Sequence, residues 1–170
     1  WQLPAHYHVE AVAIADPAIK NVGAIALTEA PQPSGKVAGD GQTFVLRDTG
    51  QEGLLEARYR LTRFRIEIAE RAFKVGDREY PAGSWILPAQ SGLRAALESL
   101  TARLALEFDA IASKPDVARH AARAPRLGVW VPWADTDSIG WLRHTLDERD
   151  VPYSYVRDED IRAGNLRPKY

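Results

Sequence analysis

The most metal-like group of side chains in this sequence lies near its start, where histidines alternate with other residues. His6, His8 and Glu10 are spaced two residues apart, so an extended strand would place all three on one face. Two imidazoles and one carboxylate form a ligand set suited to a transition metal. The alternative is that they are solvated polar positions of an amphipathic strand. We favour that alternative because the sequence indicates no fourth ligand.

Two aspartates, Asp135 and Asp137, occupy the loop after an apolar stretch at residues 126–133. A loop between a buried strand and a helix is where open α/β sheets place their ligands. Either aspartate is therefore a candidate catalytic or metal-binding carboxylate. Asp and Thr are also preferred helix N-caps, and acids suit the positive end of a helix. We favour capping by one of these aspartates or by Thr136.

A second group of acids lies at residues 157–162, directly after another predicted strand. An acid/base pair would require two of these carboxylates to face one cleft with separated pKa values. An N-cap at Asp158, with acids in the first turn of a short helix that ends near Gly164, explains the same residues. We favour the short helix.

The remaining polar candidates have ordinary structural interpretations. His144 and Asp147 are three residues apart on a predicted helix, which is typical of a surface contact. His120 lies in a predicted connector and is expected to be exposed. Ser84 lies outside any Gly-x-Ser-x-Gly motif and has no evident base partner, so we interpret its segment as a turn.

The elements that must position Asp135 and Asp137 form a strand, a helix and a second strand. Continuous apolar residues at 126–133 predict a strand buried on both faces. Residues 137–149 have helical spacing, and 152–157 form the second strand. A parallel strand pair is at best marginally stable alone. We therefore expect the unit to be incomplete, and strands from elsewhere to cover or pair with its edges.

Hydrophobic periodicity predicts mostly antiparallel β-structure before this unit, with one or two helices. The strand at 63–69 alternates charged and apolar residues, as expected for a strand with one solvated face. The sequence predicts turns at 76–77 and 81–83, and a loop at 29–42. The other predicted strands are 8–14, 21–28 and 43–48, and the predicted helices are 51–62 and 91–106, the latter capped by Ser91.

These elements predict an α+β chain: an antiparallel β-rich module with one or two helices, followed by the start of a flavodoxin-like α/β unit. The predicted domains are residues 1–112, a linker at 113–125, and the incomplete unit at 126–170. The linker is assigned from its Ala, Arg and Pro content.

Composition narrows the function classes. The 170 residues are 45% hydrophobic and 26% charged with a net charge of −1, so no basic surface argues for nucleic acid. Cys is absent, which removes disulfides, thiol nucleophiles and iron–sulfur clusters. No apolar run is long enough to span a membrane. The chain also lacks Met, and we interpret Trp1 as an interior residue of a longer product.

Several phrases of the sequence together resemble one family. They resemble the region downstream of the catalytic domain in large bacterial zinc carboxypeptidase-like proteins of the carboxypeptidase A superfamily, which includes a class I glutamine amidotransferase-like, flavodoxin-like domain. The similarity runs over most of the chain, and its motifs are structural phrases. They are WQLP at 1–4, HYHVEAV at 6–12, YRLTRF at 59–64, YPAGSWILP at 80–88, PRLGVW at 125–130, TDSIGWLR at 136–143 and RDEDIRAGNLR at 157–167.

The resemblance implies that the catalytic residues of that family lie elsewhere. Its zinc is held by a His-x-x-Glu pair and a distant His. The residues three positions after the four histidines are Val9, Ala11, Arg123 and Asp147, so no pair matches. An active glutamine amidotransferase needs a Cys nucleophile, which this chain lacks. The resemblance thus implies zinc in an upstream domain of a parent metallopeptidase, no cofactor in this chain, and a secreted or periplasmic location.

We therefore expect a non-catalytic accessory segment of a zinc carboxypeptidase-like protein, with a structural or binding role. Its expected partner is the rest of the parent polypeptide, with no nucleic acid and no membrane span; homo-oligomerisation stays open. The alternative is a hydrolase or ligand-binding site at the loop after 126–133, completed by residues outside this chain.

Overall fold

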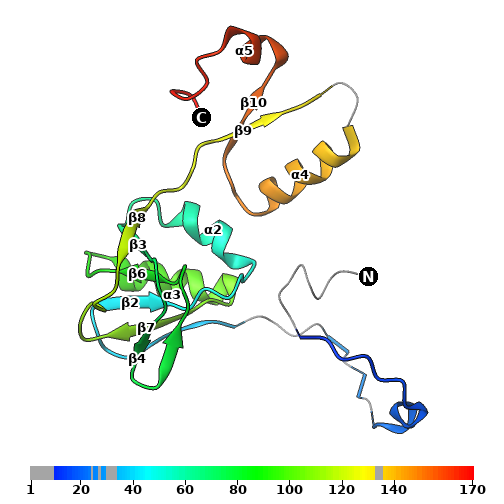
Figure 1. Cartoon of the computed structure of the whole chain (residues 1–170), viewed down its shortest axis with the longest axis vertical. Coiled ribbons are helices and arrows are strands. Elements are labelled where there is room, and N and C mark those ends of the chain that lie inside the picture. Colours follow the sequence, from blue (N-terminus) through cyan, green and yellow to red (C-terminus); the bar gives the residue numbers. More distant parts are fainter. Residues whose placement is uncertain (1–9, 24, 27, 30–33, 133–135) are drawn as a thin grey trace. The chain divides into compact units, whose positions relative to one another are not determined.

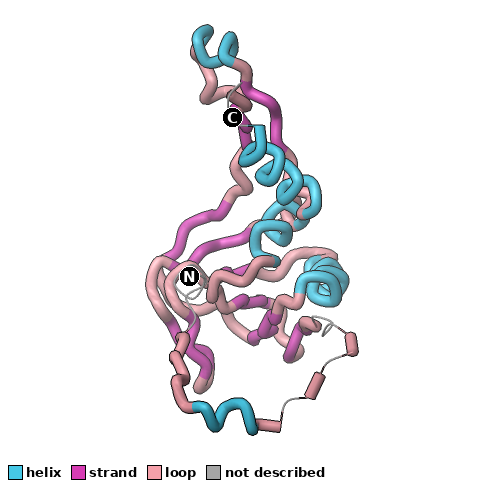
Figure 2. The backbone as a smooth tube through the Cα atoms, turned by 90° about the vertical axis from the view of Figure 1, so that its right-hand side faces the viewer, coloured by secondary structure: helices cyan, strands magenta, loops and turns pink. Residues whose placement is uncertain are grey.

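A computed structural model describes residues 10–23, 25, 26, 28, 29, 34–132 and 136–170. The chain divides into two units, Trp1–Pro33 and Ser34–Tyr170. In the first unit, the described residues form one short 3₁₀ helix, η1 (Pro17–Asn21), and otherwise run as loop (Figure 2). Asp16 caps η1 by accepting a hydrogen bond from the Ala18 N–H at 2.8 Å.

The strands predicted at 8–14 and 21–28 are wrong for the residues that the structure describes. Residues 10–14, and the described part of 21–28, pair with no other strand, and all of these residues are exposed. Alternation of apolar residues favours a strand only where a partner supplies hydrogen bonds. Among the described residues, no partner strand supplies such hydrogen bonds to these two segments.

The second unit contains a six-stranded mixed sheet (Figure 1), mostly antiparallel, in the order β1-β7-β2-β6-β3-β8. The described residues also contain four α-helices, which confirms the predicted α+β class. The sheet consists of β1 (Lys36–Ala38), β2 (Thr43–Leu46), β3 (Ile66–Ala69), β6 (Trp85–Leu87), β7 (Glu107–Ile111) and β8 (Arg119–Ala122).

Alternating side chains divide the core between the two faces of this sheet. Helices α2 (Gly53–Arg60) and α3 (Leu93–Leu104) cover one face, where Phe44, Leu87 and Leu97 lie in one buried cluster. The hairpin of β4 (Phe73–Val75) and β5 (Arg78–Tyr80) contributes to a second cluster with Val45, Tyr80 and Ile86. Both faces of the sheet are therefore covered.

Because both faces of the sheet are covered, the prediction that the strand at 63–69 has one solvated face is wrong. Glu67 is only 3% exposed, because β3 is an inner strand and the segment after β7 covers its second face with Lys114 and Val117. Alternating charge in the sequence therefore marks a buried ion cluster. The turn at 76–77 and the helices at 51–62 and 91–106 were predicted correctly in position.

Three local predictions fail for identifiable reasons. The loop predicted at 29–42 contains β1, which is only three residues long and pairs parallel with β7. The segment assigned as a linker contains β8, which pairs with β3 over four residues. Helix α3 begins after Gly92 in a left-handed conformation (φ 74°), so Ser91 is not its N-cap.

The last part of the chain contains two parallel strands, β9 (Leu127–Trp130) and β10 (Tyr153–Val156), with helix α4 (Thr136–Glu148) between them. Helix α5 (Asp158–Ala163) follows β10. Figure 1 shows β9 and β10 side by side. Val129 and Val151 pack against Leu146 of α4 in a small buried cluster.

The prediction that the strand at 126–133 is buried on both faces is wrong for β9. Val129 is 7% exposed whereas Trp130 is 46% exposed, so burial alternates along the strand. Only the α4 side is packed as a core. A β-carbon on Gly128 would lie 2.8 Å from the ring of Tyr170, so the C-terminal turn lies against the other side.

Candidate functional site

A cleft of about 600 Å³ opens where β9 and β10 end. It lies at the carboxyl ends of two parallel strands, the position at which open α/β sheets bind ligands. Register pairs Val129 with Tyr155 and Trp130 with Val156, so both strands end together. The cleft is lined by Val131, Pro132, Thr136, Arg143, Tyr155, Val156, Arg157, Asp158 and Glu159.

Arg143 enters the cleft from α4 and is held by two tyrosines of β10. Its guanidinium carbon lies 5.0 Å from the ring centroid of Tyr155, within cation–π distance. Its Nε–H donates a long hydrogen bond of 3.5 Å to the Tyr153 hydroxyl. Because Tyr153 and Tyr155 are two residues apart on a strand, both face α4 and can hold one side chain between them.

Asp147 orients this arrangement from one helical turn after Arg143. The Tyr153 hydroxyl donates to Asp147 Oδ1 at 3.1 Å, which leaves the phenol oxygen free to accept from Arg143. The hydrogen bond with Tyr153 raises the pKa of the Arg143 guanidinium. Arg143 is thus a fixed cation beside a half-exposed aromatic ring.

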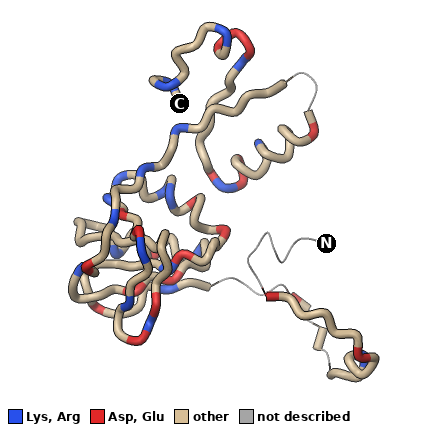
Figure 3. The backbone as a smooth tube through the Cα atoms, in the orientation of Figure 1, with Lys and Arg blue, Asp and Glu red and all other residues tan. Residues whose placement is uncertain are grey.

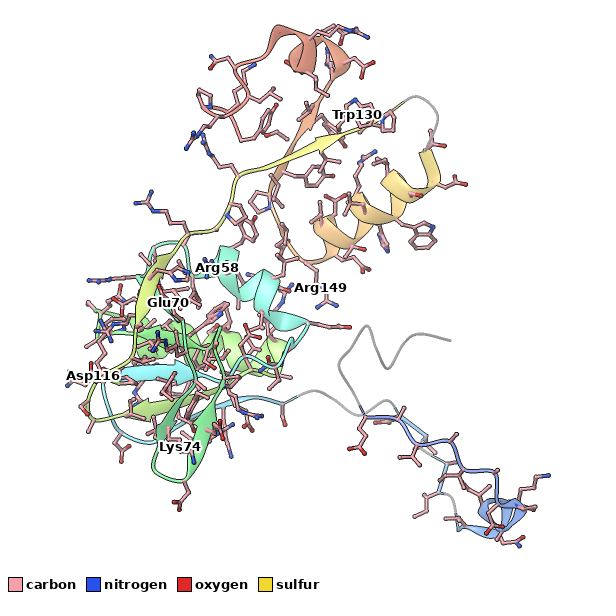
Figure 4. The ribbon with its side chains drawn as sticks, viewed as in Figure 1. Arg58, Glu70, Lys74, Asp116, Trp130 and Arg149 are labelled. Carbon is pink, nitrogen blue, oxygen red and sulfur yellow. The ribbon has the colours of Figure 1, made fainter. Side chains whose placement is uncertain are left out.

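The opposite wall of the cleft is the start of α5. Trp130 Nε1–H donates to Asp158 Oδ1 at 2.7 Å, and Asp158 also lies 3.5 Å from Arg162 (Figure 4 labels Trp130). The Arg157 N–H donates to Asp160 Oδ2 at 3.1 Å, so Arg157 is the N-cap residue. The predicted short helix that ends near Gly164 is confirmed, whereas its cap at Asp158 is shifted by one residue.

Of the two sequence candidates for catalysis, the one that the structure describes, Asp137, does not line this cleft. Asp135 lies outside the described residues. Asp137 is exposed in the first turn of α4 and lines a separate, shallow hollow with Trp141 and His144. His144 Nε2 lies 3.5 Å from Glu148 rather than pairing with Asp147. Of the loop predicted to hold the site, Thr136 lines the cleft.

The other candidates are placed as follows. His6 and His8 lie outside the described residues, and Glu10 is exposed. His120 is exposed and lies 3.2 Å from Glu70. Ser84 is fully buried, and its Oγ accepts a hydrogen bond from the Asp48 N–H. Within the residues that the structure describes, no three His, Cys, Asp or Glu side chains gather as a metal site.

A second charged cluster surrounds Glu67 in the six-stranded sheet. Arg65 lies 2.6 Å from Glu67 Oε1, while Lys114 and Arg119 lie 2.5 and 3.1 Å from Oε2. The close approach of Lys114 and Arg119 to Oε2 offsets the burial of this oxygen. Burial raises the pKa of Glu67, but Lys114, Arg65 and Arg119 outweigh it and hold the pKa below its ordinary value.

A third network joins the turn after α4 to the two helices on the sheet. Asp150 pairs with Arg60 of α2 and lies 3.4 Å from Arg103 of α3, and both arginines contact Glu56. Figure 4 labels Arg149, which donates to Glu52 at 2.9 Å. Figure 3 shows that the second unit contains both basic and acidic residues.

Sequence reasoning missed Arg143 and Tyr155 as site residues. Their signal was present as an arginine near the middle of the predicted helix and two tyrosines separated by one residue in the second strand. Nothing in the sequence pattern indicated that this arginine of the helix lies against the second strand in the folded chain. The structure supplies that information through the contacts of Arg143 with Tyr155 and Tyr153.

Comparison of the chain with protein-family models, with curated proteins and with solved structures finds no match. No helix among the described residues has the length and apolar content needed to cross a membrane.

Proposed function

We propose that this chain is a non-catalytic accessory segment of a larger zinc carboxypeptidase-like protein, and that residues 126–170 dock onto another part of that protein. The zinc and the peptidase chemistry would belong to an upstream domain, as the sequence phrases at 125–130, 136–143 and 157–167 imply by resemblance.

The observation that carries the docking role is the uneven distribution of exposed apolar side chains. Among the described residues of the second unit, the part before β9 exposes one large apolar side chain, Leu55, whereas six are exposed from β9 onward. Clustered exposed apolar residues mark interaction sites. These six are Trp130, Val131, Trp141, Leu142, Tyr155 and Ile161.

The strand edges support the same role. β9 and β10 form a two-stranded sheet, so among the described residues each strand has one hydrogen-bonded neighbour. Apart from the Tyr155 carbonyl, which accepts from the Tyr170 hydroxyl, their outer edges have no strand partner among the described residues, and such edges favour the addition of further strands. The six-stranded sheet has a buried cluster of its own and does not share this need. We therefore assign docking to the β9–β10 unit.

A comparison of the 170-residue chain with the longer gene product tests the proposal. Both are purified and assayed for release of a C-terminal residue from a peptide, and their zinc content is measured by mass spectrometry. We expect zinc and activity in the longer product, and less than about a tenth of an equivalent of zinc in the chain. Peptidase activity of the chain alone would refute the non-catalytic role.

A further inference from the structure

We propose that the cleft at the ends of β9 and β10 binds a small carboxylate with a flat apolar body, held by the guanidinium of Arg143 and the ring of Tyr155. This inference does not require the accessory role, because it uses only the described residues of this chain that line the cleft.

The charge argument begins with the unused hydrogen-bonding capacity of Arg143. A guanidinium has five N–H donors, and the structure assigns one of them, Nε–H, to Tyr153. Among the described residues, no carboxylate lies within ion-pair distance of Arg143, whereas Arg60, Arg78 and Arg103 all have such partners. The two terminal nitrogens therefore remain available for a bidentate contact, the geometry that carboxylates accept.

The other charges of the cleft select among anions. Arg157 adds a second cation without an ion pair among the described residues, and Asp158 already contacts Trp130 and Arg162. Glu159 remains as an acid at the cleft wall. Together with Arg162, which pairs with Asp158, the charged residues that line the cleft have a net charge of +1, which one carboxylate neutralises and a doubly charged phosphate exceeds. The cleft therefore favours a monoanion.

The walls indicate the rest of the ligand. Tyr155 is 50% exposed, so one side of its ring is open to a partner. Val131, Pro132 and Val156 supply apolar surface, and the volume of about 600 Å³ lies within the range of small-molecule sites. An aromatic or other planar apolar body next to the carboxylate would bury this surface, while the Arg143–Tyr155 stack fixes its orientation.

Benzoate is the probe, followed by amide chemical shifts in ¹H–¹⁵N NMR spectra of the full 170-residue chain. We expect saturable shifts at residues 131, 136 and 155–159, with a dissociation constant on the order of millimolar. Benzyl alcohol, which keeps the ring, and acetate, which keeps the charge, should each bind at least about tenfold more weakly, because each lacks one of the two recognised groups.

Variants separate recognition from nonspecific binding. Arg143→Gln should weaken benzoate binding roughly tenfold or more, and Arg157→Gln by less. Arg167→Gln is the matched control, because this exposed arginine does not line the cleft, and its affinity should equal that of the parent chain. Thermal unfolding followed by circular dichroism verifies that each variant is folded; if Arg143→Gln is not, Arg143→Lys takes its place and should also bind more weakly.

Three results would overturn the inference. Equal binding of benzoate and benzyl alcohol would remove the role of the guanidinium. Unchanged affinity in a folded Arg143 variant would do the same. Shifts that inorganic phosphate reproduces at equal concentration would reduce the site to general anion attraction.

Discussion

Glu67 lies at a position that the sequence pattern predicts to be solvated, but it is buried and surrounded by cations. Its carboxylate is buried on an inner strand of the sheet, and three cations converge on it: Arg65 just before β3, Lys114 in the loop between β7 and β8, and Arg119 of β8. A buried carboxylate without partners would take up a proton, whereas here the cations keep it ionised. The cluster connects β3 with the loop before β8. Its members Glu67 and Lys114 are 47 residues apart in the sequence.

We expect Glu67→Gln to destabilise the chain by about 2–3 kcal/mol at pH 7. This is less than a fully buried ion pair loses, because Lys114 and Arg119 retain partial contact with water. Urea unfolding followed by circular dichroism measures the change. Glu70→Gln is the control: Glu70 contacts His120 at the surface and its replacement should cost less than about 0.5 kcal/mol.

The lowered pKa of Glu67 also sets the sign of its pH dependence. A carboxyl whose folded pKa lies below its unfolded value of about 4.5 stabilises the fold above that pH. The contribution is lost as pH falls through the folded pKa. The difference in unfolding free energy between parent and Glu67→Gln should therefore shrink below about pH 4.5; a constant difference down to pH 3 would contradict this assignment.

Among the elements, α4 contains one residue that weakens it without an evident packing reason. Gly140 lies inside the helix, and a β-carbon built there meets no atom within 4 Å. Glycine in a helix interior costs conformational entropy relative to alanine. Its small side chain is therefore not required for packing in this structure.

We expect Gly140→Ala to stabilise the chain by about 0.5–1 kcal/mol, seen as a higher urea midpoint. Gly41→Ala is the contrasting variant. A β-carbon at Gly41 would lie 2.1 Å from the backbone carbonyl of Ile111 in β7, so this substitution should be clearly destabilising. Similar effects of the two substitutions would contradict the packing described for the β1–β2 turn.

The elements also show what the sequence could and could not reveal. Helices α2 and α3, the β4–β5 turn and the β9–α4–β10 order follow from periodicity and turn residues, which are local signals. β1 and β8 could not be recognised, because they depend on pairing with β7 and β3, which are distant in sequence. The cleft was predictable as a location at the end of β9, but the convergence of Arg143 and Tyr155 required the tertiary structure.

At the scale of the whole molecule, the two parts of the second unit differ in how completely they bury their apolar residues. The six-stranded sheet encloses two clusters, whereas the β9–β10 unit has a small cluster and several exposed aromatic side chains. In the proposed longer protein this difference should become smaller, because another segment would cover exposed residues outside the cleft, such as Trp141 and Leu142.

Trp141→Glu tests this expectation. Trp141 is 71% exposed, so the substitution should change the stability of the 170-residue chain by less than about 0.5 kcal/mol. In the longer gene product the same change should destabilise the β9–β10 unit by about 1–3 kcal/mol, because it would bury a charge. Hydrogen exchange of the β9 and β10 amides measures both cases, and Leu55→Glu serves as the exposed control.

If Trp141→Glu has equally small effects in both proteins, the docking surface does not include α4. If it destabilises both, the tryptophan already contributes to the packing of the 170-residue chain. Only a large effect confined to the longer product agrees with the proposed docking.

The order of the six-stranded sheet has a mechanical consequence. The chain enters this sheet at β1 and leaves it at β8, and these are its two outermost strands. Tension applied along the polypeptide would therefore act first on the two edge strands of the sheet, β1 and β8. β1 has three residues and, within the part of the chain that the structure describes, pairs only with β7, so it should detach at the lowest force while the inner strands β2, β6 and β3 remain paired.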